Sequence, residues 1–321
     1  MSAALRDKIQ YKFIVGTALK LKPNSFDPSS NEVFYYTDST EENANAYIFT
    51  EHQIRFSVRM SNKNSDVNSA TIILSNLPDD VINYVKTQKD NHIIGALYAG
   101  DNVTGLGLIS SGEITKISDV WDGGVRNTTF TIQDGSAFIK NSFTSRKFTT
   151  GVLKNEIIKD IAKDLHLPIA KFADVTGSIK SPKTYFGKTY DILKSLLDPE
   201  GYRCNIYNGE VVILPLKART EQEASYISRD SGLIGKVSSE VNNIKNSSVN
   251  GEDNSGIKFS CLLDHVLKPD ETVYIKDEVS GVDGAYKLST VNFKGDFEGN
   301  EWVSDCVAVK VDKIVSIEKI S

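Results

Sequence analysis

Apolar and polar residues alternate over much of the chain, and this period of two predicts β-strands. In the segment Gln53–Met60, Ile54, Phe56 and Val58 fall on one face and arginines on the other. The next segment, Ser69–Leu77, is β-rich and ends at a proline. We therefore expect an antiparallel β region in the first part of the chain.

A β-hairpin is predicted between residues 105 and 135. β-Branched and aromatic residues on both arms suit a half-buried pleated surface. Asp122, Gly123 and Gly124 supply the turn, because Asp and Gly tolerate the positive φ that tight hairpins need.

A similar hairpin is predicted near the C-terminus, from segments Ala285–Lys294 and Glu301–Val311. The apolar phase changes between Leu288 and Val291, which predicts a β-bulge. The recurrence of this hairpin is the pattern on which the functional interpretation depends.

The central part of the chain changes to a helical period. Leucine and isoleucine recur at i+4 within Gly151–Leu167, and a second apolar helix is predicted at Thr189–Leu197. Asn208 and Gly209 then lie between two β-rich runs, a strong hairpin signal. A short helix is also predicted at Asp79–Lys89 in the first β region.

These patterns divide the chain into three domains. We predict a first β-domain at residues 1–140, a small α+β domain at 141–218 and a second β-domain at 219–321. The first domain carries a long polar loop at 23–45. Its aromatic residues are unusual for a disordered segment, so we expect it to order against a partner.

The formal net charge is -5, which does not suit a protein that grips nucleic acid over a broad surface. The charge would suit a surface past which DNA slides, although solubility is the simpler interpretation. No apolar run approaches the roughly 20 residues of a membrane span, and no signal peptide is apparent. We expect no membrane insertion by this chain.

No metal or cofactor site is predicted. The cysteines Cys204, Cys261 and Cys306 are far apart and are expected to be small buried hydrophobic residues in strands. The histidines are scattered. The segment that begins at Gly232 lacks the spacing of a phosphate-binding loop.

No catalytic constellation is predicted, and we do not expect an enzyme. Paired carboxylates occur at 41–42, 79–80 and 296–298, in turns or at a helix start, where solvation explains them. A cell-wall hydrolase that uses such carboxylates stays open as an alternative. A carbohydrate-binding β-protein is another, suggested by Tyr35, Tyr36, Trp121 and Trp302, although such aromatics are more often core or interface residues.

The order of several segments resembles the baseplate hub proteins of contractile-tailed bacteriophages. The segments are Ile54–Met60, Asn68–Leu77, Gly112–Ile114 with Thr128–Gly135, Gly187–Leu196, Ser231–Ile234, Ile257–Asp264, Gly284–Leu288 and Gly295–Trp302. Each motif is weak alone, and their order is more specific. The loop at 23–45 and the segment 105–108 depart from the family pattern.

Nine positions are the family-signature or interface candidates. They are Asn76, Leu77, Trp121, Asp134, Gly135, Gly232, Leu233, Asp296 and Trp302. The two hairpins are expected to be matched tube-like elements, and Trp121 and Trp302, one in each, are the first residues to inspect.

The resemblance implies a mainly β, α+β fold, with two tube-protein-like antiparallel β-barrels flanking the small α+β domain. It implies a structural homotrimer in the tail baseplate of the virion. Such a hub joins the sixfold tail tube, or a distal tube protein, to the threefold central spike, contacts the tape-measure protein and lets DNA pass. The equivalent hub of a contractile secretion or bacteriocin particle is the alternative within this class.

Overall fold

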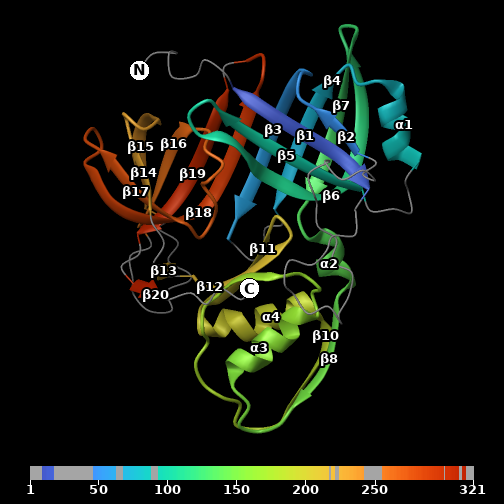
Figure 1. Ribbon diagram of the computed structural model, residues 1–321. Coiled ribbons are helices and arrows are strands. Elements are labelled where there is room, and N and C mark those ends of the chain that lie inside the picture. The colour runs from blue at the N-terminus through green and yellow to red at the C-terminus, as the bar shows by residue number, and fades with distance from the viewer. Residues whose placement is uncertain are drawn as a thin grey trace.

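The computed structural model describes residues 9–17, 46–62, 68–87, 93–216, 218–220, 224–241, 255–299, 301–310 and 313–315. The polar loop at 23–45 lies outside these residues. Two β regions lie side by side at one end of the molecule, and a smaller α+β region lies below them (Figure 1). The predicted mainly β, α+β class is confirmed.

The first β region contains seven strands and one helix among the described residues. They are β1 (Gln10–Thr17), β2 (Ala46–Phe49), β3 (Ile54–Ser61), β4 (Ser69–Ser75), α1 (Asp79–Thr87), β5 (Ile93–Asp101), β6 (Gly105–Asp122) and β7 (Val125–Gln133). The predicted helix after Pro78 is confirmed, and it buries Val81, Ile82 and Val85 as its pattern requires. Residues 105–108, which depart from the family pattern, form the regular start of β6.

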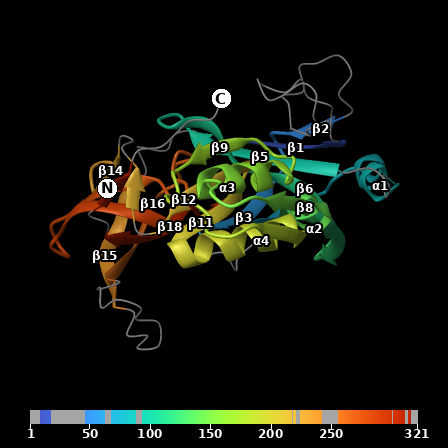
Figure 2. The ribbon, with the colours of Figure 1, turned by 90° about the horizontal axis from the view of Figure 1, so that it is seen from below.

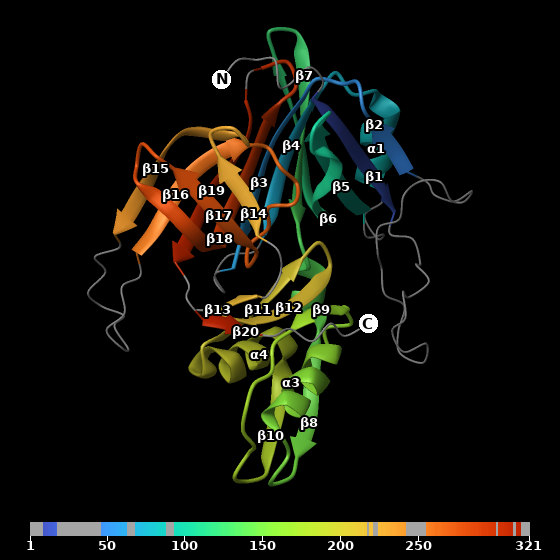
Figure 3. The same cartoon turned by 60° about the vertical axis from the view of Figure 1, so that its left-hand side comes forward.

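The α+β region has its own hydrophobic core, built around α3 and α4. Its elements are α2 (Ser136–Asn141), β8 (Phe143–Phe148), α3 (Lys154–Lys163), β9 (Ile169–Phe172), β10 (Lys183–Lys188), α4 (Thr189–Leu197), a 3-10 turn (Asp198–Glu200), β11 (Tyr202–Tyr207) and β12 (Glu210–Pro215). Seen from below, α3 and α4 lie beneath the strands (Figure 2). The two-stranded ribbon of β8 and β10 extends away from the β regions (Figure 3).

The second β region follows. Its strands are β13 (Ala218–Thr220), β14 (Ser225–Ser228), β15 (Leu233–Val241), β16 (Ser255–Leu262), β17 (Thr272–Asp277), β18 (Val282–Asp296), β19 (Trp302–Lys310) and β20 (Lys313–Val315). The linker expected at 217–223 contains β13, which pairs in parallel with β20. The prediction missed this pairing because three residues carry too little pattern.

The two β regions repeat one strand order. In the first the hydrogen-bonded order is β3-β4-β7-β6-β5, and in the second it is β15-β16-β19-β18-β17. The long strand of each hairpin carries an irregularity at the corresponding point, between Ile114 and Lys116 in β6 and between Leu288 and Thr290 in β18. The bulge predicted from the apolar phase of the second hairpin is therefore confirmed, and the first hairpin has its counterpart.

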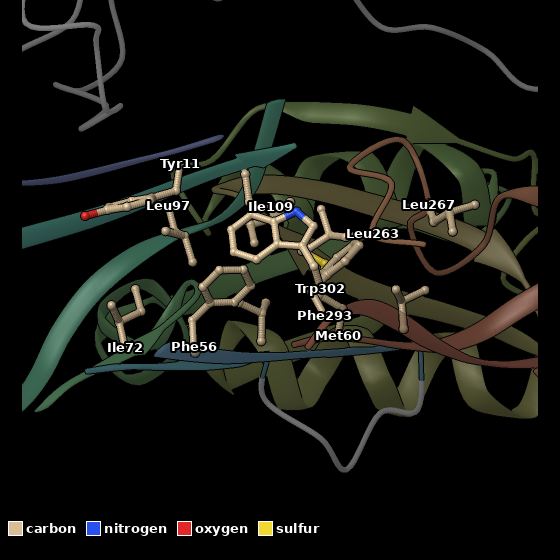
Figure 4. Close-up of a cluster of buried hydrophobic side chains, with 14 of the residues drawn as sticks. Tyr11, Phe56, Met60, Ile72, Leu97, Ile109, Leu263, Leu267, Phe293 and Trp302 are labelled. Carbon is tan, nitrogen blue, oxygen red and sulfur yellow. The ribbon is translucent and has the colours of Figure 1, made fainter. Parts of the chain in front are cut away.

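The two regions are joined edge to edge. β18 pairs antiparallel with β3, with Phe293 opposite Val58, so thirteen strands form one continuous sheet. Their buried side chains also form a single cluster, in which Phe56 of the first region packs against Trp302 of the second (Figure 4). The backbone joins two similar units as though they were neighbouring subunits.

Candidate assembly surfaces

The tip of the β6–β7 hairpin is an exposed apolar surface. Gly123 and Gly124 form its two-residue turn, with φ of 56° and 86°, the positive values that the sequence predicts. Next to the turn, Val120 and Trp121 are exposed by 59% and 68%, and Val125 is also exposed. Large apolar groups that gather at a projecting tip typically mark a contact site.

Charged side chains fix this hairpin to α1. The Arg126 guanidinium binds the Asp79 carboxylate and lies 3.4 Å from Asp119, while Lys86 Nζ lies 2.7 Å from Asp119. Burial raises the pKa of Asp119, but hydrogen bonds from Lys86 and Thr128, with the charges of Lys86 and Arg126, outweigh burial and lower the pKa below its ordinary value. The tip is therefore held in one orientation.

Asn76 and Leu77 follow directly after β4, and Asn76 supports the same hairpin. Asn76 has a left-handed backbone with φ of 56°. Its backbone N–H donates to the Arg126 carbonyl at 2.7 Å, and its Oδ1 accepts from the Arg126 N–H at 3.2 Å. Leu77 is buried in the main core.

Trp302 has a different place from Trp121. Its side chain is 2% exposed and packs edge to face on Phe56, with ring centroids 5.1 Å apart (Figure 4). Opposite it on β18 lies Gly295, where a Cβ would come within 2.3 Å of Phe56 and 2.8 Å of the indole. In the repeat, the residue that corresponds to Trp121 is Gly295, so the two tryptophans occupy different positions of the two hairpins.

Asp296 and Gly232 stabilise turns in the second region. Asp296 Oδ1 accepts from the backbone N–H groups of Glu298 and Gly299 at 3.2 and 3.0 Å. Gly232 has φ of 111°, and its carbonyl accepts from the Leu262 N–H at 2.9 Å. Leu233 follows at the start of β15 and is buried. These three candidates have local structural roles at the ends of strands.

Asp134 and Gly135 lie at the junction with the α+β region. The buried Asp134 carboxylate accepts from the backbone N–H groups of Asn208 and Gly209, the second at 3.0 Å, at the turn of the β11–β12 hairpin. Gly135 has φ of 65°, and a Cβ there would come within 2.9 Å of Ile206. Burial raises the pKa of Asp134 to about 7 although both N–H groups favour its charged form.

A second polar cluster at this junction escaped the sequence analysis. Lys287 is fully buried, lies 2.9 Å from Asp270 and donates to the Pro215 carbonyl at 2.9 Å. Asn62 and Tyr207 each donate to the Asp270 carboxylate at 3.1 Å. The cluster joins both β regions to the α+β region. In the sequence, the only indication of this cluster is Lys287, a lysine next to Leu288 in an apolar strand.

The cysteines, the metal-ligating residue types and the helices were also considered as possible functional features. The three cysteines lie in strands and are buried, as predicted, and burial raises the pKa of Cys204 to about 12. Within the described ranges, no group of three or more His, Cys, Asp and Glu side chains could hold a metal ion. No helix in the same ranges is long and apolar enough to cross a membrane.

The outer edges of the sheet offer free backbone groups. Beyond Glu113, β6 pairs with β7 and with no other described strand. β15 pairs with β16 on one side and lies at one end of the strand order, whose other end is β2. Unpaired N–H and C=O groups at such edges can extend a neighbour's sheet.

Comparisons with known proteins give the fold a context. No protein-family model matches the sequence, and no curated protein matches it significantly. The 43 kDa tail protein of prophage MuSo2 from Shewanella oneidensis matches with a TM-score of 0.58 at 10% identity, over 82% of this chain and 94% of that one. The tail protein from Neisseria meningitidis MC58 matches with a TM-score of 0.57 at 9% identity, over 94% and 96%.

A secretion-system protein has the same fold. The E. coli c3393 protein, a component of the type VI secretion system with structural similarity to the bacteriophage T4 tail proteins gp27 and gp5, matches with a TM-score of 0.56 at 10% identity. That match covers 81% of this chain and 74% of the other. The chain therefore has the fold of phage tail and related secretion-system proteins, in agreement with the resemblance to baseplate hubs.

Proposed function

We propose that this chain is a structural baseplate hub of a phage tail, a homotrimer that joins a sixfold tail tube to a threefold central spike. One observation carries the proposal: two β regions of the same strand order are joined edge to edge in one chain by β18 and β3. Three copies would present six similar units. A threefold protein would then match a sixfold tube.

The geometry of the edges supports a closed ring. The free edges of β6 and β15 lie toward opposite sides of the molecule (Figure 1). A contact between two different edges is heterologous, and repeated rotation by the same angle closes it into a ring. The edges could continue from copy to copy the sheet that β18 and β3 continue within the chain.

The proposed work is that of an adaptor. The ring would bind the tail tube or a distal tube protein on one side and the central spike on the other, and it would contact the tape-measure protein. After the spike leaves, DNA would pass through the ring without specific binding, which the net charge of -5 favours. The location that we propose is the tail baseplate of the virion.

The equivalent hub of a contractile secretion or bacteriocin particle is the second candidate. The similarity to the c3393 protein favours it, because that protein belongs to a type VI secretion system. The neighbouring genes distinguish the two: capsid and terminase genes indicate a phage, and their absence beside a complete set of sheath and tube genes indicates a secretion-type or bacteriocin particle.

Mass measurement in solution and cryo-EM imaging test the proposal. We expect a trimer at micromolar concentration and a ring that binds tube protein on one side and spike protein on the other. A chain that stays monomeric at all concentrations and forms no ring with tube or spike would contradict it. Incubation with peptidoglycan gives an independent check, because cleavage abolished by an Asp or Glu substitution would indicate a hydrolase.

A further inference from the structure

The two-stranded ribbon of β8 and β10 has one packed face and one open face. On the packed face, Thr144 is fully buried and donates to the Asp164 carboxylate at 3.0 Å, and Arg146 forms an ion pair with the same carboxylate. The side chains that alternate with these lie on the other face of the ribbon and are exposed. We call them the open face: Phe143, Ser145 and Lys147 of β8, with Thr184, Phe186 and Lys188 of β10.

Two phenylalanines form the apolar part of the open face. Phe143 and Phe186 are exposed by 53% and 74%, and Phe186 is the most exposed large apolar side chain among the described residues. Their rings pack edge to face, with centroids 4.7 Å apart. A single exposed apolar residue is ordinary, but two in contact form a patch, and such patches mark contact sites.

The segments that carry the ribbon are positively charged, although the chain as a whole is acidic. Residues 136–155 and 175–190 contain seven lysine and arginine residues and no aspartate or glutamate, whereas the net charge of the chain is -5. Arg146 and Lys154 form ion pairs within the chain. The five others are exposed and form no ion pair with a described residue: Lys140, Lys147, Lys180, Lys183 and Lys188. A ligand that complements this surface is negatively charged.

Both strands of the ribbon also have an outer edge without a strand partner. β8 and β10 pair with each other over six residues, and no other described strand pairs with either. Unpaired N–H and C=O groups at such an edge can bind an added strand, whose alternate side chains then give specificity. Nucleic acid and lipid cannot extend a sheet, so the open edges favour a polypeptide among the anionic ligands.

We propose that the ribbon binds an extended acidic segment of a partner protein, which adds to it as a third strand. Lys147 and Lys188 lie at the two ends of the open face, with the phenylalanines between them. An apolar side chain of the segment would cover the phenylalanines, and carboxylates two residues before and after it would pair with the lysines. The ribbon extends away from the β regions (Figure 3), so this contact does not depend on the proposed trimer.

A designed peptide tests the proposal. The sequence Thr-Glu-Thr-Ile-Thr-Glu-Thr has about the length of a ribbon strand and places isoleucine between glutamates on one face. We expect this peptide to bind the wild-type chain in fluorescence anisotropy, at a protein concentration too low for assembly. The same peptide with lysine in place of glutamate should bind roughly tenfold more weakly, and added salt should weaken the binding of the acidic peptide.

Substitutions on the open face identify where the peptide binds. Phe186→Ser should lower the affinity by roughly tenfold, because it removes the exposed ring that the isoleucine covers. The double variant Lys147→Glu with Lys188→Glu should lower it at least as much, because it places like charges opposite the glutamates. All three side chains are exposed, so the variants should fold, and circular dichroism checks that they do.

Matched controls lie in the second β region. Tyr226 is exposed by 53%, as Phe143 is, so Tyr226→Ser removes an exposed ring elsewhere on the surface. The double variant Lys236→Glu with Lys276→Glu makes the same change of net charge at exposed positions. Both controls should bind the peptide as the wild type does. A loss of affinity equal to that of the open-face variants would overturn the proposed site.

Methylation of the peptide backbone tests the added strand. Alternate N–H groups of an extended segment point to opposite sides, so only one set can face the ribbon. A peptide that is N-methylated at its odd positions and one that is N-methylated at its even positions should therefore differ in affinity by roughly tenfold. Equal affinities of the two would overturn the third strand.

Two other anionic ligands complete the test. Oligothymidine and vesicles of anionic phospholipid should bind the chain more weakly than the peptide. Tighter binding of either, lost in Phe186→Ser, would show a ligand of another class and overturn the proposal, as would a wild-type chain that does not bind the peptide. The hub proposal stands or falls separately, on the oligomeric state and on ring formation.

Discussion

The β6–β7 and β18–β19 hairpins have the same backbone plan and opposite surroundings. Both have a long first strand with an irregularity at the corresponding point. The second hairpin has β3 on its outer edge and buries Trp302, whereas the first has a free outer edge and exposes Trp121. The same backbone plan therefore serves as core in one region and as exposed surface in the other.

The largest expected difference lies between the two tryptophans. Trp302→Ala should lower the free energy of unfolding by roughly 3–5 kcal/mol, because it leaves a cavity beside Phe56. Trp121→Ala should change it by no more than about 0.5 kcal/mol, because the indole is mostly exposed. Urea unfolding at a protein concentration too low for assembly, followed by circular dichroism, measures both. Equal losses of unfolding free energy would show that the two tryptophans are equally buried.

The next comparison is between the corresponding positions Lys287 and Glu113. Lys287→Met should destabilise the chain by about 3 kcal/mol, the low end for breaking a buried ion pair, because Asn62 and Tyr207 still donate to Asp270. Glu113→Gln is the control, since Glu113 is only half-buried. The same unfolding measurement applies, and a small effect of Lys287→Met would mean that the pair contributes little to the junction.

Gly295→Ala tests how tightly the internal junction is packed. The new Cβ would overlap Phe56 and approach the indole of Trp302, so we expect a loss of about 1–3 kcal/mol. Gly284→Ala on the same strand is the control, because the nearest heavy atom to its Cβ would be 3.8 Å away. Thermal unfolding of the two variants should separate them. Similar midpoints would indicate that β3 and β18 can move apart without cost.

The last comparison is a pH dependence of opposite sign at the base and tip of the first hairpin. Burial raises the pKa of Asp134 to about 7, so the folded state holds this proton more tightly than the unfolded state. The contribution of Asp134 to stability should therefore fall as pH rises from about 4 to 7. The pKa of Asp119 is lowered, so its contribution should be lost as pH falls below the ordinary range of an Asp carboxyl.

Unfolding curves of Asp134→Asn and Asp119→Asn, each subtracted from the wild type between pH 3 and pH 8, measure the two slopes. Slopes of the same sign would contradict the assigned environments. The other carboxylates of the chain cancel in the subtraction.

Local chemistry made the turns and helices predictable. Asn208 and Gly209 have φ of 53° and 80°, the positive values that the Asn-Gly pair favours, and α4 spans Thr189–Leu197 as its apolar residues indicate. The short strands β8 and β10 were missed because their polar residues hide the period of two.

Pairing between distant strands was not predictable. Nothing in the residues of β3 shows that β18 will lie beside it, so the place of Trp302 in the core could not be distinguished from that of Trp121. The candidates Asp134 and Gly135 were found as part of a motif, but their contact with Asn208 and Ile206 depends on how two regions meet. The domain limits at 140 and 218 stay predictions.

The pairing of β18 with β3 also sets the order in which the chain can fold during synthesis. Ser61 and Thr290 are paired, and translation at about 5–20 residues per second needs roughly 10–50 s to make the chain between them. During that interval β3 has an open edge of the kind that attracts other strands. The first half of the nascent chain would have to wait, shielded or bound by a chaperone, for the last strands to leave the ribosome.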